Sequence, residues 1–172
     1  MTGDSAALRR PATARSEAAS WFDELYRSSI ADVHAYVAAL LRDRVAAEDV
    51  VALAFERAFR HRCLFNAQRG TARAWVFAIA RNAALDELRG RRRVAPLDFE
   101  VAEGSRSDEG LVDRATVRAG LAKLDPHERE LILLKFHGQL TNAELARVLR
   151  ISESNAGTRL HRAVGRLREE CA

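Results

Sequence analysis

The sequence is poor in cysteine and in long apolar runs, and both shortages restrict where the protein can work. Its two cysteines, Cys63 and Cys171, stand far apart, which argues against a disulfide framework and favours a reducing compartment. No apolar run approaches the roughly 18 residues that a membrane-spanning helix requires. The first residues mix glycine, proline, alanine and arginine without the apolar segment of a secretory signal. We therefore expect a soluble, cytoplasmic protein.

Residues with the spacing of a catalytic or metal site are lacking as well. His61 and Cys63 have no second ligand pair at a usable spacing, so we expect no zinc site. His34, His127 and His161 lack a nucleophile or carboxylate partner at a spacing typical of catalysis. The sequence thus predicts no enzyme, no bound metal and no cofactor.

Lysine is nearly absent, and the charge is unevenly distributed. Of 28 basic residues only Lys123 and Lys135 are lysine, and the other 26 are arginine, whose planar fork of donors suits phosphate and guanine. Genome composition alone could produce the same bias. Residues 94–113 carry a net charge of −5, so the rest of the chain carries +9 within the total of +4. This pattern predicts two basic bodies joined by an acidic connector.

The sequence also lacks the alternation of apolar and polar residues that is typical of β-strands, whereas helical periodicity recurs from Trp21 onward. Apolar stripes predict helices that end near Asp43, span 47–60 and 71–93, and resume near Val112. We expect an all-α fold of two small helical domains joined by a flexible acidic linker. The expected parts are a disordered arm at 1–15, a first domain at 16–93, the linker at 94–113 and a second domain at 114–172.

The helix at 47–60 has two distinct faces. Its apolar stripe consists of Ala47, Val50, Val51, Ala54, Phe55, Ala58 and Phe59. The opposite face carries Glu48, Asp49, Leu53, Glu56, Arg57 and Arg60. A leucine among charges is either part of a partner surface or one of the isolated exposed leucines that are common in proteins.

The helix at 71–93 is predicted to bury Ala72, Trp75, Val76, Ile79, Ala80 and Ala83 and to expose Arg73, Phe77, Arg81, Asn82, Asp86 and Arg89. Four arginines fall within its residues 89–93, among them Arg91 and Arg92, which is more than complementing the helix dipole requires. We interpret them as a polyanion contact. Aromatic rings among arginines suit single-stranded nucleic acid, where bases stack on the rings. For Trp75, simple core packing is an equal alternative.

Residues 126–136 are predicted to form a helix because Asp125 can cap it and Pro126 suits its first position. Its apolar face is expected to end with Phe136, and Gly138 is expected to stop it.

Residues 141–167 have the layout of a helix-turn-helix. Thr141 and Glu144 can form a capping box, and Ser152 can begin a second helix that buries Ala156, Leu160, Val164 and Leu167. The other face of this helix presents side chains able to reach phosphates or base edges in a major groove, namely Ser154, Asn155, Thr158, Arg159 and Arg162. The alternative is a plain helical hairpin. Arg150 stands where such turns often have glycine, and Gly157 costs the second helix about 1 kcal/mol relative to alanine.

Taken in order, these segments resemble the bacterial RNA polymerase sigma factors of the extracytoplasmic-function (ECF) group, over about residues 21–168. FDELYRSSIADVHAYV, DRVAAEDVVALAFERAF and ARAWVFAIARNAALDELRGRRR look like the family's region two. LAKLDPHERELILLKFHGQLTNAELARVLRIS and RLHRAVGRLREE look like its region four.

The resemblance implies a role for each surface. The face with Glu48, Asp49, Leu53, Glu56, Arg57 and Arg60 would bind the clamp helices of core polymerase, and region four would meet its flap. The helix at 71–93 would engage the non-template strand of the minus-ten element through Arg73, Trp75, Arg81, Asn82, Asp86, Arg89, Arg91 and Arg92. The helix-turn-helix would bind the minus-thirty-five duplex. The linker would lead toward the RNA exit path, and an anti-sigma factor is a usual partner.

Three departures from the family pattern concern these surfaces. Ala52, Leu53 and Ala54 replace the usual Gln-Glu-Thr, which puts the polymerase contacts there in doubt. Residues 154–157 replace the common Gly-Thr-Val-Lys, so promoter specificity does not carry over. Ala72 replaces an aromatic residue. Two other functions remain open, a stand-alone helix-turn-helix regulator and a helical protein-interaction module.

Overall fold

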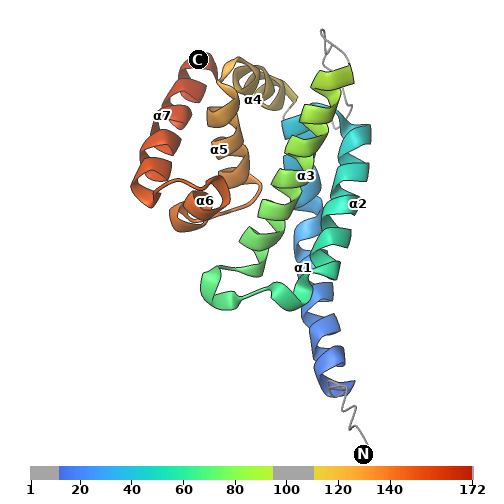
Figure 1. Cartoon of the computed structure of the whole chain (residues 1–172). Helices are drawn as coiled ribbons and strands as arrows, with labels where there is room; N and C mark the ends of the chain where they lie inside the picture. Colours follow the sequence, from blue (N-terminus) through green and yellow to red (C-terminus); the bar gives the residue numbers. More distant parts are fainter. Residues whose placement is uncertain (1–11, 95–110, 172) are drawn as a thin grey trace, which may run out of the picture.

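Seven α-helices make up the part of the chain that the structure, a computed structural model, describes, which is residues 12–94 and 111–171 (Figure 1). Side chains are described for 20–91 and 115–171. The helices are α1 (Ala12–Leu41), α2 (Arg44–Arg60), α3 (Ala72–Val94), α4 (Leu111–Lys123), α5 (Pro126–Phe136), α6 (Asn142–Leu149) and α7 (Glu153–Cys171). Two short 3₁₀ turns, Arg62–Leu64 and Ala67–Arg69, connect α2 to α3. The all-α prediction is confirmed.

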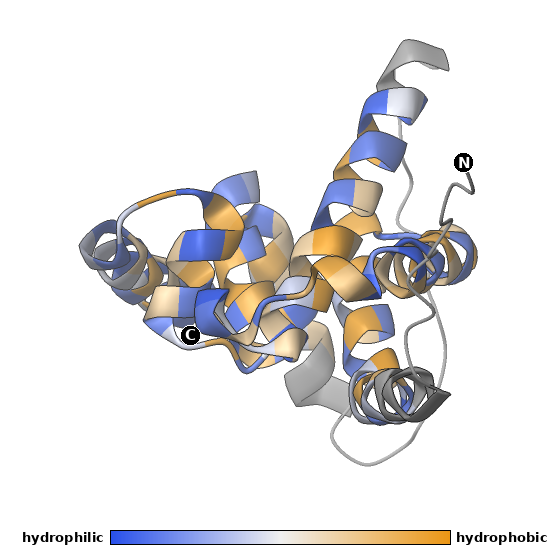
Figure 2. Cartoon of the chain, turned by 60° about the horizontal axis from the view of Figure 1, so that its bottom comes forward, coloured by the Kyte–Doolittle hydropathy of each residue, from blue (hydrophilic) through white to orange (hydrophobic). Residues whose placement is uncertain are grey.

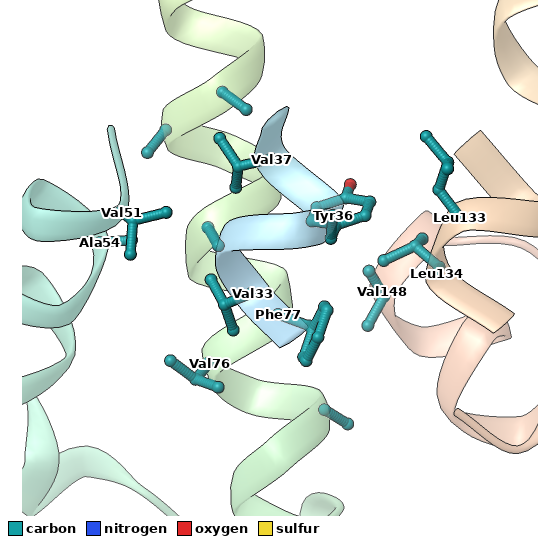
Figure 3. Packing of buried hydrophobic residues seen from close by; sticks show 14 of the residues in the cluster. Val33, Tyr36, Val37, Val51, Ala54, Val76, Phe77, Leu133, Leu134 and Val148 are labelled. Atoms are coloured by element: carbon teal, nitrogen blue, oxygen red, sulfur yellow. The ribbon is translucent and has the colours of Figure 1, made fainter. Parts of the chain in front are cut away.

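Helices α1, α2 and α3 form the first unit. Its core holds small and β-branched side chains, among them Val33, Val37, Val51, Ala54 and Val76, which let the three helices approach closely (Figure 3). Asp43 caps α2 by accepting a hydrogen bond from the Ala46 amide at 3.0 Å. Every member of the predicted α2 stripe is buried except Phe59, which is 46% exposed and lies against Phe22 and the Arg62 guanidinium.

Helix α1 is one continuous helix that begins at Ala12, earlier than the expected start near Trp21. It therefore includes the last residues of the segment expected to be a disordered arm. Residues 1–11, and residues 95–110 of the expected linker, lie outside the described part. Figure 1 shows that the N-terminal part of α1 projects beyond the other helices, and Figure 2 shows hydrophobic and hydrophilic residues alternating along the helices.

The second unit consists of α4 to α7. The predicted start of α5 is confirmed, since the Asp125 carboxylate accepts a hydrogen bond from the His127 amide at 2.9 Å and Pro126 opens the helix. The expected burial of Phe136 is wrong, because this side chain is 64% exposed. Helix α5 buries two faces instead of one: Ile132 packs with Leu124 and Ala163, while Leu133 and Leu134 face the first unit. Phe136 lies on neither face.

The two units pack directly against each other, through α1 with α5 and α3 with α6. Tyr36 and Phe77 of the first unit share one hydrophobic core with Leu133, Leu134 and Val148 of the second (Figure 3). The Arg42 guanidinium adds a hydrogen bond of 3.2 Å to the carbonyl of Ala122 on α4. The sequence suggested two bodies held together only by a linker, whereas the structure joins them through a common core.

Candidate nucleic-acid interface

Local hydrogen bonds build the start of α6 and the turn that joins α6 to α7. The capping box is confirmed: the Thr141 hydroxyl accepts from the Glu144 amide at 3.3 Å, and the Thr141 amide donates to the Glu144 carboxylate at 2.9 Å. Arg150 takes the left-handed conformation with φ 56°, which costs an arginine more than the glycine often found there. The Ile151 amide then bonds the Ala146 carbonyl, and Ser152 caps α7 by accepting from the Asn155 amide at 3.2 Å.

Helix α7 presents the side chains predicted to read a duplex. Ala156 and Ala163 are buried against the rest of the second unit, with Leu160, Val164 and Leu167 partly buried beside them. On the opposite side Ser154, Thr158, Arg159 and Arg162 are exposed and Asn155 is half-buried. Two guanidinium groups and several short polar side chains therefore face outward from one helix.

Gly157 can be replaced without strain. A Cβ there would lie 3.4 Å from the Asn142 side-chain amide, an ordinary contact, so Gly157→Ala should raise the free energy of unfolding by about 0.5–1 kcal/mol through helix propensity. At Gly138 a Cβ would lie 2.4 Å from the Leu134 carbonyl oxygen, so Gly138→Ala should destabilise. Urea unfolding of both variants checks the contrast, and stabilisation by Gly138→Ala would contradict this structure of the turn.

The residues of α3 that were predicted to contact single-stranded nucleic acid fall into two groups by exposure. Asn82, Asp86 and Arg89 are exposed, and Asp86 pairs with Arg89 at 2.9 Å and with Arg57 at 3.8 Å. Arg73, Trp75 and Arg81 are half-buried. Helical spacing explains why Arg73 and Arg81 differ from the exposed group, because positions 73, 77 and 81 share one face while 82, 86 and 89 share another.

Two aromatic predictions on α3 need correction. Phe77 was expected to be exposed but is fully buried, with its ring centroid 5.6 Å from that of Tyr36. The reason is that α3 packs against α1 and α2 on one side and against α6 on another, so it has two buried faces. Trp75 belongs to an aromatic cluster with Trp21 and Phe65, at centroid distances of 6.4 and 5.5 Å, as its core-packing alternative anticipated.

The arginines at the end of α3 are not all directed to solvent. The Arg91 guanidinium pairs with Glu87 at 2.8 Å and with Asp43 at 3.0 Å, and the hydrogen bond that it donates to Glu87 is the main reason that its pKa is raised. Its side chain thereby ties the end of α3 to the start of α2. The side chain of Arg92 lies outside the described part.

Arg73 is held by oxygen atoms from both units. Its guanidinium donates to the carbonyls of Gly138 at 2.6 Å and His137 at 2.9 Å, in the turn that follows α5. The same group pairs with Asp32 on α1 at 2.6 Å. Burial lowers the pKa of His137 in this turn.

Arg81 forms a two-pronged ion pair with Glu130 of α5, at 2.7 and 3.2 Å. The Arg81 side chain is 19% exposed and that of Glu130 is 6% exposed. Tyr36 lies beside this pair, and burial raises the pKa of its hydroxyl well above the usual value, with Glu130 adding to the rise. Sequence patterns give no sign of these contacts, since the paired residues are 49 positions apart.

Glu144 is a third link between the units, because its carboxylate accepts a hydrogen bond from the Thr71 hydroxyl as well as from Thr141. Burial of Glu144 opposes ionisation, but the bonds from Thr71 and Thr141 lower its pKa. A depressed folded pKa contributes stability above the unfolded value of about 4.3, and this contribution is lost as pH falls through the folded pKa.

Glu144→Gln should therefore lower the free energy of unfolding by about 1–2 kcal/mol at pH 7. The difference from the parent should shrink as pH falls below the unfolded value of about 4.3 and through the lower folded pKa of Glu144. Urea unfolding at pH 7 and at pH 3.5 measures both values. An equal deficit at the two pH values would show that the charge of Glu144 is not what matters.

Helix α2 presents the face that the resemblance assigns to core polymerase. Glu48, Asp49, Glu56 and Arg60 are exposed, Arg57 is half-buried, and Leu53 is 38% exposed. Glu56 and Arg60 pair at 2.6 Å. Other large apolar side chains of this unit are also exposed, although the sequence pattern did not indicate it: Tyr26, Val45, Phe59 and Leu64.

Both units of the chain match known protein families. Residues 25–94 match the family of sigma-70 region 2, and residues 114–167 match that of sigma-70 region 4. The ECF RNA polymerase sigma factor SigL of Mycobacterium tuberculosis is 32% identical over 167 residues, which cover 94% of each chain. No helix in the described part of the chain is both long and apolar enough to cross a bilayer.

Two solved structures have a similar fold. The sigma factor RpoE of Bartonella quintana, in complex with the anti-sigma factor NepR, has a TM-score of 0.77 at 22% identity, over 87% of this chain and 95% of that one. CnrH, in complex with the cytosolic domain of CnrY, has a TM-score of 0.67 at 26% identity, over 90% of this chain and 92% of that one.

Proposed function

This chain belongs to the ECF RNA polymerase sigma factors, and from that premise we propose which of its surfaces bind polymerase and which bind promoter DNA. As a sigma factor it directs core RNA polymerase to specific promoters for transcription initiation. The observation that carries the assignment is that the outward faces of α2 and α7 are exposed on opposite sides of the molecule (Figure 1). One chain can therefore hold a protein and a duplex at once.

Helix α7 is the proposed reader of the minus-thirty-five element. Arg159 and Arg162 would contact guanine edges or phosphates, and Ser154, Asn155 and Thr158 would contact neighbouring groups in the major groove. The exposure of Ser154, Thr158, Arg159 and Arg162 supports this role.

Helix α3 is the proposed contact for the minus-ten non-template strand. Asn82, Asp86 and Arg89 are the members exposed to solvent, and Arg73, Trp75, Arg81, Arg91 and Arg92 complete the set. A strand needs both phosphate contacts, which the arginines supply, and a surface for unstacked bases. Trp75 would serve the bases from its place in the aromatic cluster.

The outward face of α2 is the proposed contact for the polymerase clamp helices, with region four at the flap. Leu53 lies among the exposed charges of this face, so Leu53→Asp should weaken binding to core polymerase at least about tenfold by placing a carboxylate in an apolar contact. Competition against the unmodified chain measures the loss. Leu64→Asp, at an exposed leucine of the first unit that lies outside α2, is the matched control and should bind as the parent does. Equal binding by all three chains would remove α2 from the polymerase interface.

We further propose that an anti-sigma protein regulates this chain, since one solved relative is bound by the anti-sigma factor NepR. The chain itself would catalyse no reaction and would act in the cytoplasm, where its binding energy positions polymerase. Polymerase would supply the chemistry.

Transcription with purified components tests the function. Core polymerase and this chain, supplied with fragments of the genome of origin, should yield transcripts whose mapped start sites share two upstream elements. Core polymerase alone should yield none of them. Duplex binding without polymerase, together with no dependent transcript, would favour a stand-alone regulator, and failure of both would favour a protein-interaction module.

A further inference from the structure

We propose that the cavity between the C-terminal end of α1 and helices α4 and α5 binds a small phosphorylated molecule of the class of the nucleoside diphosphates. The cavity has a volume of about 310 Å³, within the range of about 300–1,000 Å³ that is usual for small-molecule sites. None of the residues that line it is among those proposed to contact DNA or polymerase. The site therefore goes beyond the proposed function and does not depend on it.

One wall of the cavity is apolar. It is formed by alanines in the last two turns of α1 and by leucines of α4 and α5, namely Ala35, Ala38, Ala39, Leu121 and Leu133. The alanines follow one another at spacings of three and one, so the first is a helical neighbour of both others and all three lie on one face of α1. Because alanine side chains are short, this face leaves room between the helices and offers a flat surface to a planar ring.

Arginines from four segments complete the lining: Arg42 after α1, Arg44 at the start of α2, Arg118 on α4 and Arg129 on α5. Of the described residues in the lining, only Asp43 is acidic, and its carboxylate already caps α2 and pairs with Arg91. No carboxylate in the described part of the chain forms an ion pair with Arg42, Arg118 or Arg129. The cavity thus has an excess of positive charge.

Two of these guanidinium groups are held in place by the end of α4. Arg129 donates hydrogen bonds to three of its carbonyls at 2.6, 2.9 and 3.0 Å, and Arg42 donates to one of the same carbonyls, that of Ala122, at 3.2 Å. The carbonyls are neutral, so they orient the two groups without cancelling their charges. Burial lowers the pKa of Arg129, and the like charge of Arg42 lowers it further, against a smaller opposite effect of Asp125. An anion between the two arginines would relieve this repulsion.

The combination of an apolar wall and clustered arginines selects the class of ligand. A phosphate group offers several oxygens to guanidinium donors and forms strong, charge-assisted hydrogen bonds with them. A simple inorganic anion would leave the alanine face unused, whereas an uncharged apolar molecule would leave the arginine charges uncompensated. A nucleoside diphosphate has both a planar ring for the wall and phosphates for the arginines.

Arg42→Gly and Arg118→Gln are the variants that test the site. Arg42 has a φ of 54°, in the left-handed region that favours glycine, so glycine removes the guanidinium without straining the backbone. Arg118 is exposed on α4, and glutamine keeps its helix propensity. Arg27→Gln is the matched control, because Arg27 is an exposed arginine of α1 that does not line the cavity. Circular dichroism checks that all three variants keep their helices.

Isothermal titration calorimetry of the full chain measures binding of ADP, GDP, pyrophosphate and adenosine. The parent should bind one ADP or GDP per chain, should bind pyrophosphate more weakly, and should not bind adenosine. Each cavity variant should weaken nucleotide binding at least about tenfold, since each removes a charge-assisted contact, and Arg27→Gln should not. The bound nucleotide should also raise the urea midpoint of the parent, because it binds only the folded chain.

Absence of saturable binding by either nucleotide at millimolar concentration would overturn the inference. Equal binding by the parent and both cavity variants would also overturn it, because the nucleotide would then bind elsewhere on the basic surface. Pyrophosphate binding as tightly as the nucleotides would contradict the role of the apolar wall and with it the class of ligand. Promoter-dependent transcription by the parent chain without added nucleoside diphosphate tests the proposed function separately.

Discussion

Replacing Arg159 and Arg162 together by alanine should abolish promoter-dependent transcription, with a loss of about two orders of magnitude or more. Each well-placed arginine contact with a base edge is worth about 1–3 kcal/mol, and two contacts multiply in the binding constant. Both side chains are exposed, so folding stability should change by less than about 0.5 kcal/mol per site. Run-off transcription and binding to core polymerase are measured side by side, and binding should be retained.

Arg168→Ala is the control for this pair. Arg168 is also an exposed arginine of α7, but it lies about 180° around the helix from Arg159 and close to the C-terminal end of α7, away from the predicted contacts at the start of the helix. Its removal should change transcription little. If polymerase binding fell as much as transcription in the double variant, the assignment of separate surfaces to DNA and polymerase would be wrong.

Replacing Phe77 by alanine should lower the free energy of unfolding by about 3–5 kcal/mol, a large part of the stability of a small domain. The ring is fully buried and touches core residues from both units, so its loss leaves a cavity that neither unit can fill alone. Urea unfolding measures the change, with the midpoint followed by circular dichroism.

Phe136→Ala provides the comparison, because this ring is 64% exposed and its loss should cost less than about 1 kcal/mol. The sequence pattern alone predicts the reverse order, with Phe136 buried and Phe77 exposed. A deficit for Phe77→Ala below about 1 kcal/mol would show that α3 does not bury this face in solution, and the shared core of the two units would then be contradicted.

The features that the sequence predicted correctly depend on interactions between residues close together in the chain. The caps at Asp125, Thr141 and Ser152 use side chains within three residues of the amides they bind, so local spacing was sufficient. The buried stripe of α7 was found because that helix packs its apolar side mainly against α4, α5 and α6 of its own unit. The outward side chains of α7 followed from it by elimination.

What the sequence could not predict depended on contacts between distant residues. Periodicity describes one apolar stripe for each helix, whereas α3 and α5 each bury two faces, which is why Phe77 and Phe136 were misplaced. The pairing of Arg81 with Glu130 and of Arg73 with the turn at Gly138 joins positions 49 and 65 residues apart. Charged side chains on a helix are read as solvent-facing, and only tertiary packing reveals an opposite charge beside them.

Binding of the purified chain to core RNA polymerase is the most direct measurement of whether its surfaces work as proposed. Titrating labelled chain with core enzyme at physiological salt should give saturable one-to-one binding. Unlabelled parent chain should displace the labelled chain, whereas the unlabelled Leu53→Asp variant should displace it poorly. Absence of saturable binding at micromolar polymerase would contradict the proposed role, whatever affinity the chain shows for DNA.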